Sequence, residues 1–502
     1  MSDDAPPREG GKSQAFDVEY QMPQKHASEV DSRGLRRSDK ESYDDDGHVA
    51  RTGGWVTAYA HIVTAVIGSG VLSLAWSMSW LGWPGGALCI FAFAWVTLYC
   101  SELLIDAYRY PAVDSPHRNH TYIEAVTCYL GRPYAIFCGI IQYLNMFATG
   151  VGYTLTAGVA LTAVKKADCY HFSGTTKADA DNPCTFSQTP WIIFMGALQI
   201  VLSQIQDIDR VWIMSVVATI MAFIYSFIGL GLSIGMATEH PNGTGTADGL
   251  WDAQTPATKT WGIFQALGSI AFAYSFSFIL LEITDTLRSP GENGNMKRAT
   301  RFGVATTTFF YASIGFIGYA AFGNGAPGNL ISGFGFYKPY WLVDIANIAI
   351  FIHLLGAFQV WMQPLYGFVE MSLYKRFPGQ AWMQYDLFAT KVPGLGIVRL
   401  SPFRLVWRSV TVVIITILAL LLGNCFNDVI AFLGAIGFAP LTVFLPIQMH
   451  IVQKRIPMWS AKWWGLHVLD VICWMVSIVA AIGSIIGIIA DTQGFAPFQT
   501  TA

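Results

Sequence analysis

WVTAYAHIVTAVIGSGVLSLAWSMSW, residues Trp55 to Trp80, is the stretch that decides how this chain must fold. It contains no Asp, Glu, Lys or Arg, and as a helix it is long enough to cross the ~30 Å hydrocarbon core of a bilayer. Its middle is Gly68-Ser69-Gly70, and glycine holds helical geometry more weakly than any residue except proline. We therefore expect a membrane helix that opens at this point. An opened helix leaves backbone N–H and C=O groups unpaired, which a membrane tolerates only where protein or a polar cavity, such as a ligand site, supplies partners.

The composition of the whole chain agrees with a membrane protein. Charged residues make up 13% of the 502 residues and apolar residues 53%, whereas soluble proteins carry about 25% charged residues. Charge-poor windows recur as far as Ile489, which indicates one integral domain over residues 51–490. Residues 1–50 lack the apolar core of a cleavable signal peptide, and their 12 acidic and 7 basic residues predict a disordered cytosolic tail.

The fold class predicted from these windows is an all-α polytopic membrane protein with eleven transmembrane helices. The predicted helices are Trp55–Trp80, Gly85–Ala107, Ala135–Ala163, Trp191–Gln206, Val211–Gly235, Trp261–Ile283, Phe302–Phe322, Trp341–Val369, Leu405–Leu422, Val429–Ile451 and Trp463–Ala490.

The distribution of basic residues predicts the orientation in the membrane. With the amino terminus in the cytosol, 25 of the 30 Lys and Arg residues lie on the inner side, as the positive-inside rule requires. An odd number of helices then places residues 491–502 outside the cell as a short tail. Cys169 and Cys184 fall in the outer loop between the third and fourth helices, in an oxidising compartment, so we expect them to form a disulfide.

The sixth predicted helix contains a second irregular stretch, Gly268 to Phe278, in which small and hydroxylated residues alternate with aromatic ones. The first and sixth helices are five apart and enter the membrane from opposite sides. This is the pattern of two inverted five-helix repeats whose first helices are broken, with one helix added.

Several long motifs, in the right order, resemble plant amino acid permeases of the amino acid/auxin permease family, within the APC superfamily. They lie at Ala60–Trp76, Gln142–Asn145, Leu202–Ile205, Leu267–Tyr274, Leu280–Leu287, Ala326–Leu330, Asp344–Asn347 and His353–Val360. The resemblance implies a LeuT-type carrier, not an enzyme, that imports neutral and often acidic amino acids with protons across the plasma membrane. Its partners would be the amino acid and the lipid bilayer, with no nucleic acid, no cofactor besides the proton, and no metal. Ser269 stands where the family often has Asp, so no role of that carboxylate carries over.

An amino acid zwitterion needs an anion site and a cation site a few ångströms apart. If the first helix breaks at Gly68, Ser69 and Gly70, the half-helix that follows points free N–H groups and its positive dipole end at a carboxylate. Free carbonyls from Thr64 to Ile67 and from Phe272, through Ala273 and Tyr274, to Ser275 would then suit the ammonium group. The alternative is that the glycines only allow close packing of helices.

Aromatic residues are the expected contacts of the substrate side chain. The best candidates are Phe272, Tyr274 and Phe276, together with Tyr143, Asn145 and Thr149 near the middle of the third helix.

Proton coupling needs a titratable group inside the membrane, and His61 and His353 are the candidates. The alternative for each is a neutral buried histidine that makes one hydrogen bond. Glu282 and Asp285 could close the cytosolic exit by pairing with Arg288 or Arg301, but we favour plain interfacial charges. Asp344 and Asp470 receive no role beyond packing.

Other functions find little support in the sequence. Gly323 to Gly328 matches G-x-G-x-x-G, but it follows a membrane helix instead of a strand and contains a proline, so we interpret it as a loop. The chain has no Walker loop, H-E-x-x-H or C-x-x-C motif. An auxin or other organic-acid carrier of the same fold and a non-transporting amino acid sensor remain as alternatives, and so does sodium coupling.

Overall fold

The structure is a computed structural model that describes residues 51–492 except 175–183, 206–211, 240–244, 251–254, 335–338, 378–379, 381, 383–387, 393–395 and 424. All described residues belong to the compact unit 43–502. The predicted tail at 1–50 and most of the predicted tail at 491–502 lie outside the described residues.

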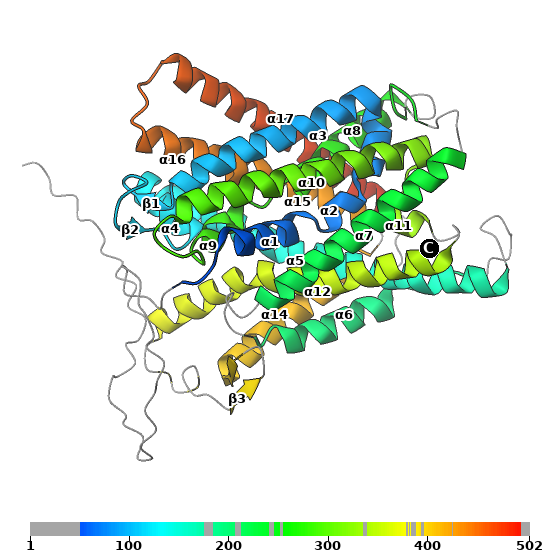
Figure 1. Cartoon of the computed structure of the whole chain (residues 1–502), viewed down its shortest axis with the longest axis horizontal. Helices are drawn as coiled ribbons and strands as arrows, with labels where there is room; N and C mark the ends of the chain where they lie inside the picture. Colours follow the sequence, from blue (N-terminus) through cyan, green and yellow to red (C-terminus); the bar gives the residue numbers. More distant parts are fainter. Residues whose placement is uncertain are drawn as a thin grey trace, which may run out of the picture. The chain divides into compact units, whose positions relative to one another are not determined.

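The described chain is almost entirely helical, and Figure 1 shows how its elements are arranged. The first half contains α1 (Trp55–Val66), α2 (Ser69–Leu72), α3 (Leu74–Asp106), β1 (Arg109–Tyr110), β2 (His117–Arg118), α4 (Tyr122–Leu130), α5 (Arg132–Ser173), α6 (Thr189–Leu202) and α7 (Trp212–Glu239).

The middle contains α8 (Pro256–Ala273), the 3₁₀ turn η2 (Ser277–Ile279), α9 (Leu280–Thr284), α10 (Glu292–Phe322), the 3₁₀ turn η3 (Gly323–Gly325), α11 (Leu330–Gly333) and α12 (Tyr340–Arg376). The last part contains β3 (Phe388–Val392), β4 (Gly396–Leu400), α14 (Pro402–Leu421), α15 (Phe426–Gly437), the π-helical segment η4 (Phe438–Phe444), α16 (Leu445–Gln453) and α17 (Ala461–Thr492). β1 pairs with β2 and β3 with β4, each as an antiparallel hairpin.

The predicted polytopic helical fold is confirmed. Within the described residues, nine helical stretches are long and apolar enough to cross a membrane, and Trp55–Val66 and Thr189–Leu202 are shorter apolar helices. The number of eleven transmembrane helices stays a prediction.

The predicted boundary between the first two spans, at residues 81–84, falls on a sharp kink. α3 covers Leu74–Asp106 as two helical parts that meet at Gly82, which leaves helical geometry with φ +70°. The physical reason is the close approach of the loop near Gly249: the N–H of Leu250 donates to the carbonyl of Ser79 at 2.8 Å. Only glycine adopts this conformation without strain, so the chain kinks at Gly82 without forming a loop.

The broken helices are held inside the bundle by long, continuous ones. α10 runs beside α3 and also packs on α1 and α7, while α12 lies along α5 and α7 (Figure 1). α8 packs against α15 and α17, and α2 contacts α8 directly. The two interruptions predicted from the sequence therefore meet in the interior.

Candidate functional site

The first helix breaks where the sequence predicted. α1 ends at Val66, Gly68 has φ −124° and ψ −140°, and helical geometry resumes at Ser69. Gly70 is needed for close approach: a Cβ there would lie 2.8 Å from the Cα of Ala273, closer than real side chains come. The break is therefore both a helix opening and a packing contact with the sixth span, so the two interpretations of the glycines do not exclude each other.

The sixth span is also broken. α8 ends at Ala273, Tyr274 to Phe276 are not helical, and the chain continues through η2 into α9. The side chain of Ser275 folds back and donates to the carbonyl of Ala271 at 2.7 Å. Small and hydroxylated residues thus let α8 end inside the protein while some of its last carbonyls gain local partners.

Three of the carbonyls at the breaks, those of Val66, Ile67 and Ala273, lie within hydrogen-bonding distance of a buried hydroxyl, which the sequence did not predict. The hydroxyl of Tyr311, from α10, lies 2.5 Å from the carbonyl oxygen of Val66 and 2.9 Å from that of Ala273. The hydroxyl of Tyr225, from α7, donates to the carbonyl of Ile67 at 2.9 Å. These buried carbonyls need donors, and two tyrosines on neighbouring helices supply them.

A small cavity lies where the breaks meet. Its volume is about 10 Å³, and it is lined by Ala65, Val66, Gly68, Ser69, Gly70, Tyr153, Phe272, Ser275 and Trp361. Five of these residues were predicted for the site. Tyr153 and Trp361 were not, although their aromatic rings, 6.4 Å apart, form one wall. A volume of this size has room for about one water molecule, so this conformation is closed around its site.

Ser69 lines the cavity, and its buried hydroxyl is one of the polar groups near the break that lack a partner among the described residues. Ser69 also begins the helical turn after the break, where backbone N–H groups have no carbonyl one turn earlier to bond to. The cavity therefore has hydrogen-bond donors on one side and the ends of α1 and α8 on the other.

Seven other predicted contacts lie off the cavity lining: Ile67, Ala273, Tyr274, Asn145, Phe276, Tyr143 and Thr149. The carbonyl of Ile67 accepts from the hydroxyl of Tyr225 at the break, and Ala273 lies against Gly70, where the two broken helices meet. The hydroxyl of Tyr274 points to Thr308 at 3.2 Å, and the amide of Asn145 donates to the carbonyl of Leu433 at 2.9 Å. In this conformation both side chains join helices to one another.

The structure places the two candidate histidines differently. His353, in α12, bonds through Nδ1 to the carbonyl of Ala218 at 2.9 Å, so Nδ1 carries the proton and Nε2 is an acceptor. That Nε2 has no partner among the described residues, and it lies 3.8 Å from where a Cβ on Gly68 would be. His353 thus faces the break. His61 is buried in α1, seven residues before Gly68.

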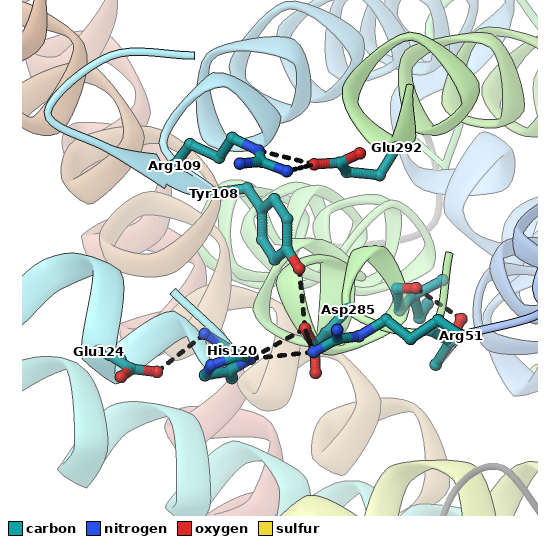
Figure 2. A network of polar contacts seen from close by, with 9 residues as sticks. Arg51, Tyr108, Arg109, His120, Glu124, Asp285 and Glu292 are labelled. Carbon is teal, nitrogen blue, oxygen red and sulfur yellow. Dashed lines mark hydrogen bonds and ion pairs between the residues drawn. The ribbon is translucent and has the colours of Figure 1, made fainter. Parts of the chain in front are cut away.

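A second polar cluster lies at the end of the bundle predicted to face the cytosol (Figure 2). The carboxylate of Asp285 accepts from Arg51 at 2.8 Å and from the hydroxyl of Tyr108 at 2.8 Å, and it lies 3.0 Å from Nδ1 of His120. Burial alone would lower the pKa of His120, but the hydrogen bond and charge of Asp285, with Glu124, raise it above the ordinary value.

These partners correct the sequence-based interpretation of Asp285 as a plain interfacial charge. Among the residues that the structure describes, Asp285 pairs with neither of the predicted bases: Arg301 binds Glu102, and Arg288 donates through its backbone to the carbonyl of Gly53 at 2.9 Å. Arg51 and Gly53 immediately precede α1. The cluster therefore ties the start of the first helix to the end of the sixth. Glu282, one turn earlier, instead accepts from the N–H of Tyr122 and the amide of Gln142, each at 3.3 Å.

The structure also describes the two cysteines and the glycine-rich segment noted in the sequence. Cys169 and Cys184 form a disulfide at the end of α5. Gly323 to Gly325 form a 3₁₀ turn after α10. In the part of the chain that the structure describes, no group of three or more His, Cys, Asp or Glu residues could hold a metal ion.

The chain resembles known proteins both in sequence and in fold. The sequence profile of a family described as "Transmembrane amino acid transporter protein" matches residues 51–490. Amino acid permease 2 of Arabidopsis thaliana is 46% identical, over 91% of this chain and 92% of that protein. Amino acid permease 3 of the same plant is 47% identical, over 91% and 95%. Among solved structures, MhsT in complex with L-phenylalanine has a TM-score of 0.52 at 13% identity and covers 88% of this chain and 99% of that one, which supports the predicted LeuT-type fold.

Proposed function

Because the chain belongs to the family of transmembrane amino acid transporter proteins, we propose that it imports amino acids together with protons across the plasma membrane by alternating access. The observation that supports this best is the cavity between the two broken helices, which offers hydrogen-bonding groups of both kinds in the interior of a membrane protein. The relatives named amino acid permeases support the substrate class.

The geometry suggests how a zwitterion would bind. The α-carboxylate would lie against the N–H groups that begin at Ser69 and against the Ser69 hydroxyl, which lacks a partner among the described residues. The α-ammonium group would approach the ends of α1 and α8, since each carbonyl oxygen can accept a second hydrogen bond. The substrate side chain would meet Phe272, Tyr153 and Trp361. Neutral amino acids fit this apolar wall, and we propose that acidic ones are also carried.

Binding requires the bundle to open. A cavity of about 10 Å³ cannot hold an amino acid, so Tyr153, Trp361 and Phe272 must move apart to admit one. The cluster around Asp285 joins the start of the first broken helix to the end of the sixth, on the side of the bundle predicted to face the cytosol. We infer that it must separate before the substrate can leave toward the cytosol, with the amino terminus on that side.

His353 is the proposed coupling residue. Protonation at Nε2 would place a positive charge beside Gly68, next to the proposed carboxylate position. A bound proton and a bound carboxylate would then stabilise each other, and by linkage each raises the affinity for the other. His61 is proposed as a second proton-carrying group, seven residues closer to the start of α1.

The test is uptake of radiolabelled proline, glutamate and the auxin indole-3-acetate in a permease-deficient host, at pH 5.5 and pH 8, with and without sodium. We expect amino acid uptake that is faster at pH 5.5 and unaffected by sodium. Uptake of auxin alone would favour the organic-acid carrier, and amino acid binding without uptake would favour a sensor. Uptake that requires sodium and ignores pH would overturn the proton coupling.

A further inference from the structure

Tyr311 connects the two broken helices. Its hydroxyl bonds to the carbonyls of Val66 and Ala273, which are the last residues of α1 and α8. The side chain is fully buried in α10, and its ring meets that of Tyr274 edge-on at 5.1 Å. Because one hydroxyl contacts both helix ends, it fixes their separation.

Tyr225 has a similar position at the next carbonyl. Its hydroxyl donates to Ile67 at 2.9 Å, with the carbonyl of Gly68 at 3.4 Å, and its ring lies edge-on to His353 at 5.7 Å. It comes from α7, so two different helices each bring one buried hydroxyl to the break.

Carbonyls at the ends of broken membrane helices are the groups that hold coupling cations such as sodium in carriers of this architecture. A metal cation there needs several of these oxygens to turn toward one point, whereas an ammonium group needs only one remaining lone pair on each carbonyl that it contacts. In this chain the hydroxyl of Tyr225 donates to the carbonyl of Ile67, and the single proton of the Tyr311 hydroxyl is shared between the carbonyls of Val66 and Ala273. A neutral donor satisfies a buried carbonyl without bringing a charge that must be paid for in desolvation.

We propose that the hydroxyls of Tyr311 and Tyr225 permanently take the place of a metal cation at these carbonyls. Tyr311 is then a positioning residue: it holds the ends of α1 and α8 in the geometry that binds substrate, and no sodium ion is needed to assemble the site. The inference rests on the proposed function, because it concerns the same cavity. Among the described residues, neither tyrosine lines that cavity, so both act through the backbone and not by touching the substrate.

The test compares Tyr311→Phe with Tyr366→Phe in uptake of radiolabelled proline at pH 5.5, with rates expressed per copy at the cell surface. Both tyrosines are fully buried, but the hydroxyl of Tyr366 bonds to Ser203 at 3.2 Å, away from the breaks. We expect the KM of Tyr311→Phe to rise about tenfold or more, while Vmax stays within about twofold of wild type. The control should keep the wild-type KM. A purely structural role would lower surface abundance and leave KM unchanged, which would overturn the proposal.

Two further experiments distinguish a failure of this inference from a failure of the proposed function. Replacement of sodium by choline should leave wild-type uptake unchanged, and a sodium requirement would overturn the inference. Tyr225→Phe should raise KM in the same direction, which provides a second variant if Tyr311→Phe fails to reach the surface; an unchanged KM would again contradict us.

Wild-type uptake that is indifferent to pH would instead refute proton coupling while leaving the comparison of KM values intact. If the cells take up no proline, the same variants are compared by proline binding to the purified full chain, where equal Kd values would overturn the inference.

Discussion

Replacement of His353 by glutamine is the perturbation that most directly probes the proposed coupling. Glutamine cannot be protonated at physiological pH, yet it keeps an amide donor that can reach the carbonyl of Ala218, now bonded to Nδ1 at 2.9 Å. The substitution therefore removes the titratable group and preserves hydrogen bonding and approximate size. His467→Gln is the matched control, because His467 packs on Trp463, with ring centroids 4.0 Å apart, and lies in α17 outside the site.

The expected magnitude follows from Coulomb's law. A protonated His353 beside Gly68 and a carboxylate at the N–H groups after the break would be roughly 6 Å apart, which at an effective dielectric constant of about 20 gives ~3 kcal/mol. That energy corresponds to about a 100-fold difference in proline affinity between the protonated and the neutral carrier. The sign is fixed by linkage: proton binding strengthens carboxylate binding, so affinity is high at acid pH and falls as pH rises.

The assay is equilibrium binding of radiolabelled proline to the purified full chain, which has no ion gradient to complicate the result. Between pH 5.5 and pH 8 the Kd of wild type should rise by up to about 100-fold. The Kd of His353→Gln should change less than about threefold, near the high-pH wild-type value. A His353→Gln variant that retains the wild-type pH dependence would refute the reasoning, and His61→Gln would then be the next candidate to examine.

Three other predictions follow from single contacts. Gly70→Ala should reduce uptake more than about tenfold at normal surface abundance, because its Cβ would lie 2.8 Å from the Cα of Ala273, whereas Gly465→Ala, with nothing within 4 Å, should transport normally. The pKa of His120 is raised, so its imidazole should be fully protonated and paired with Asp285 below pH ~6.5, and the pair should be lost as the pH rises through the raised pKa of the folded protein. Hydrogen exchange of the Gly53 amide, corrected for intrinsic rates, should then be at least about threefold slower at pH 6 than at pH 8, and equal protection at both would contradict this; His120→Gln should abolish the difference. Cys169→Ser removes a disulfide that spans 15 positions and should cost about 3 kcal/mol of stability, seen as a lower melting temperature than that of Cys89→Ser; identical melting curves would argue against it.

Local sequence signals were enough to predict the breaks. Gly68 and Gly70 interrupt an apolar helix, and the small and hydroxylated residues around Ser275 interrupt another, so both features can be recognised in short windows of sequence. The pairing of Cys169 with Cys184 was also expected, since they are the two cysteines of one outer loop. His353 stood out because a titratable residue inside an apolar span is costly and rare.

The partners of these features could not be predicted, because they are set by tertiary packing over long distances along the chain. Tyr311 is separated by 245 positions from Val66, and Asp285 by 234 from Arg51. Nothing in a local pattern distinguishes Tyr311 from the other tyrosines of the apolar helices. A usable signal did exist in general form: a buried hydroxyl needs a partner, and a broken helix has carbonyls to offer. Tyr153 and Trp361 were missed for the same reason.

The measurement that tests the central claim most directly is an electron cryo-microscopy map of the full chain with proline bound. We expect density for the amino acid between the two breaks, with its carboxylate against Ser69 and Gly70 and its ring toward Phe272, Tyr153 and Trp361. Density for proline elsewhere in the bundle, or α1 and α8 each continuing as an unbroken helix through residues 67–73 and 274–279, would contradict it.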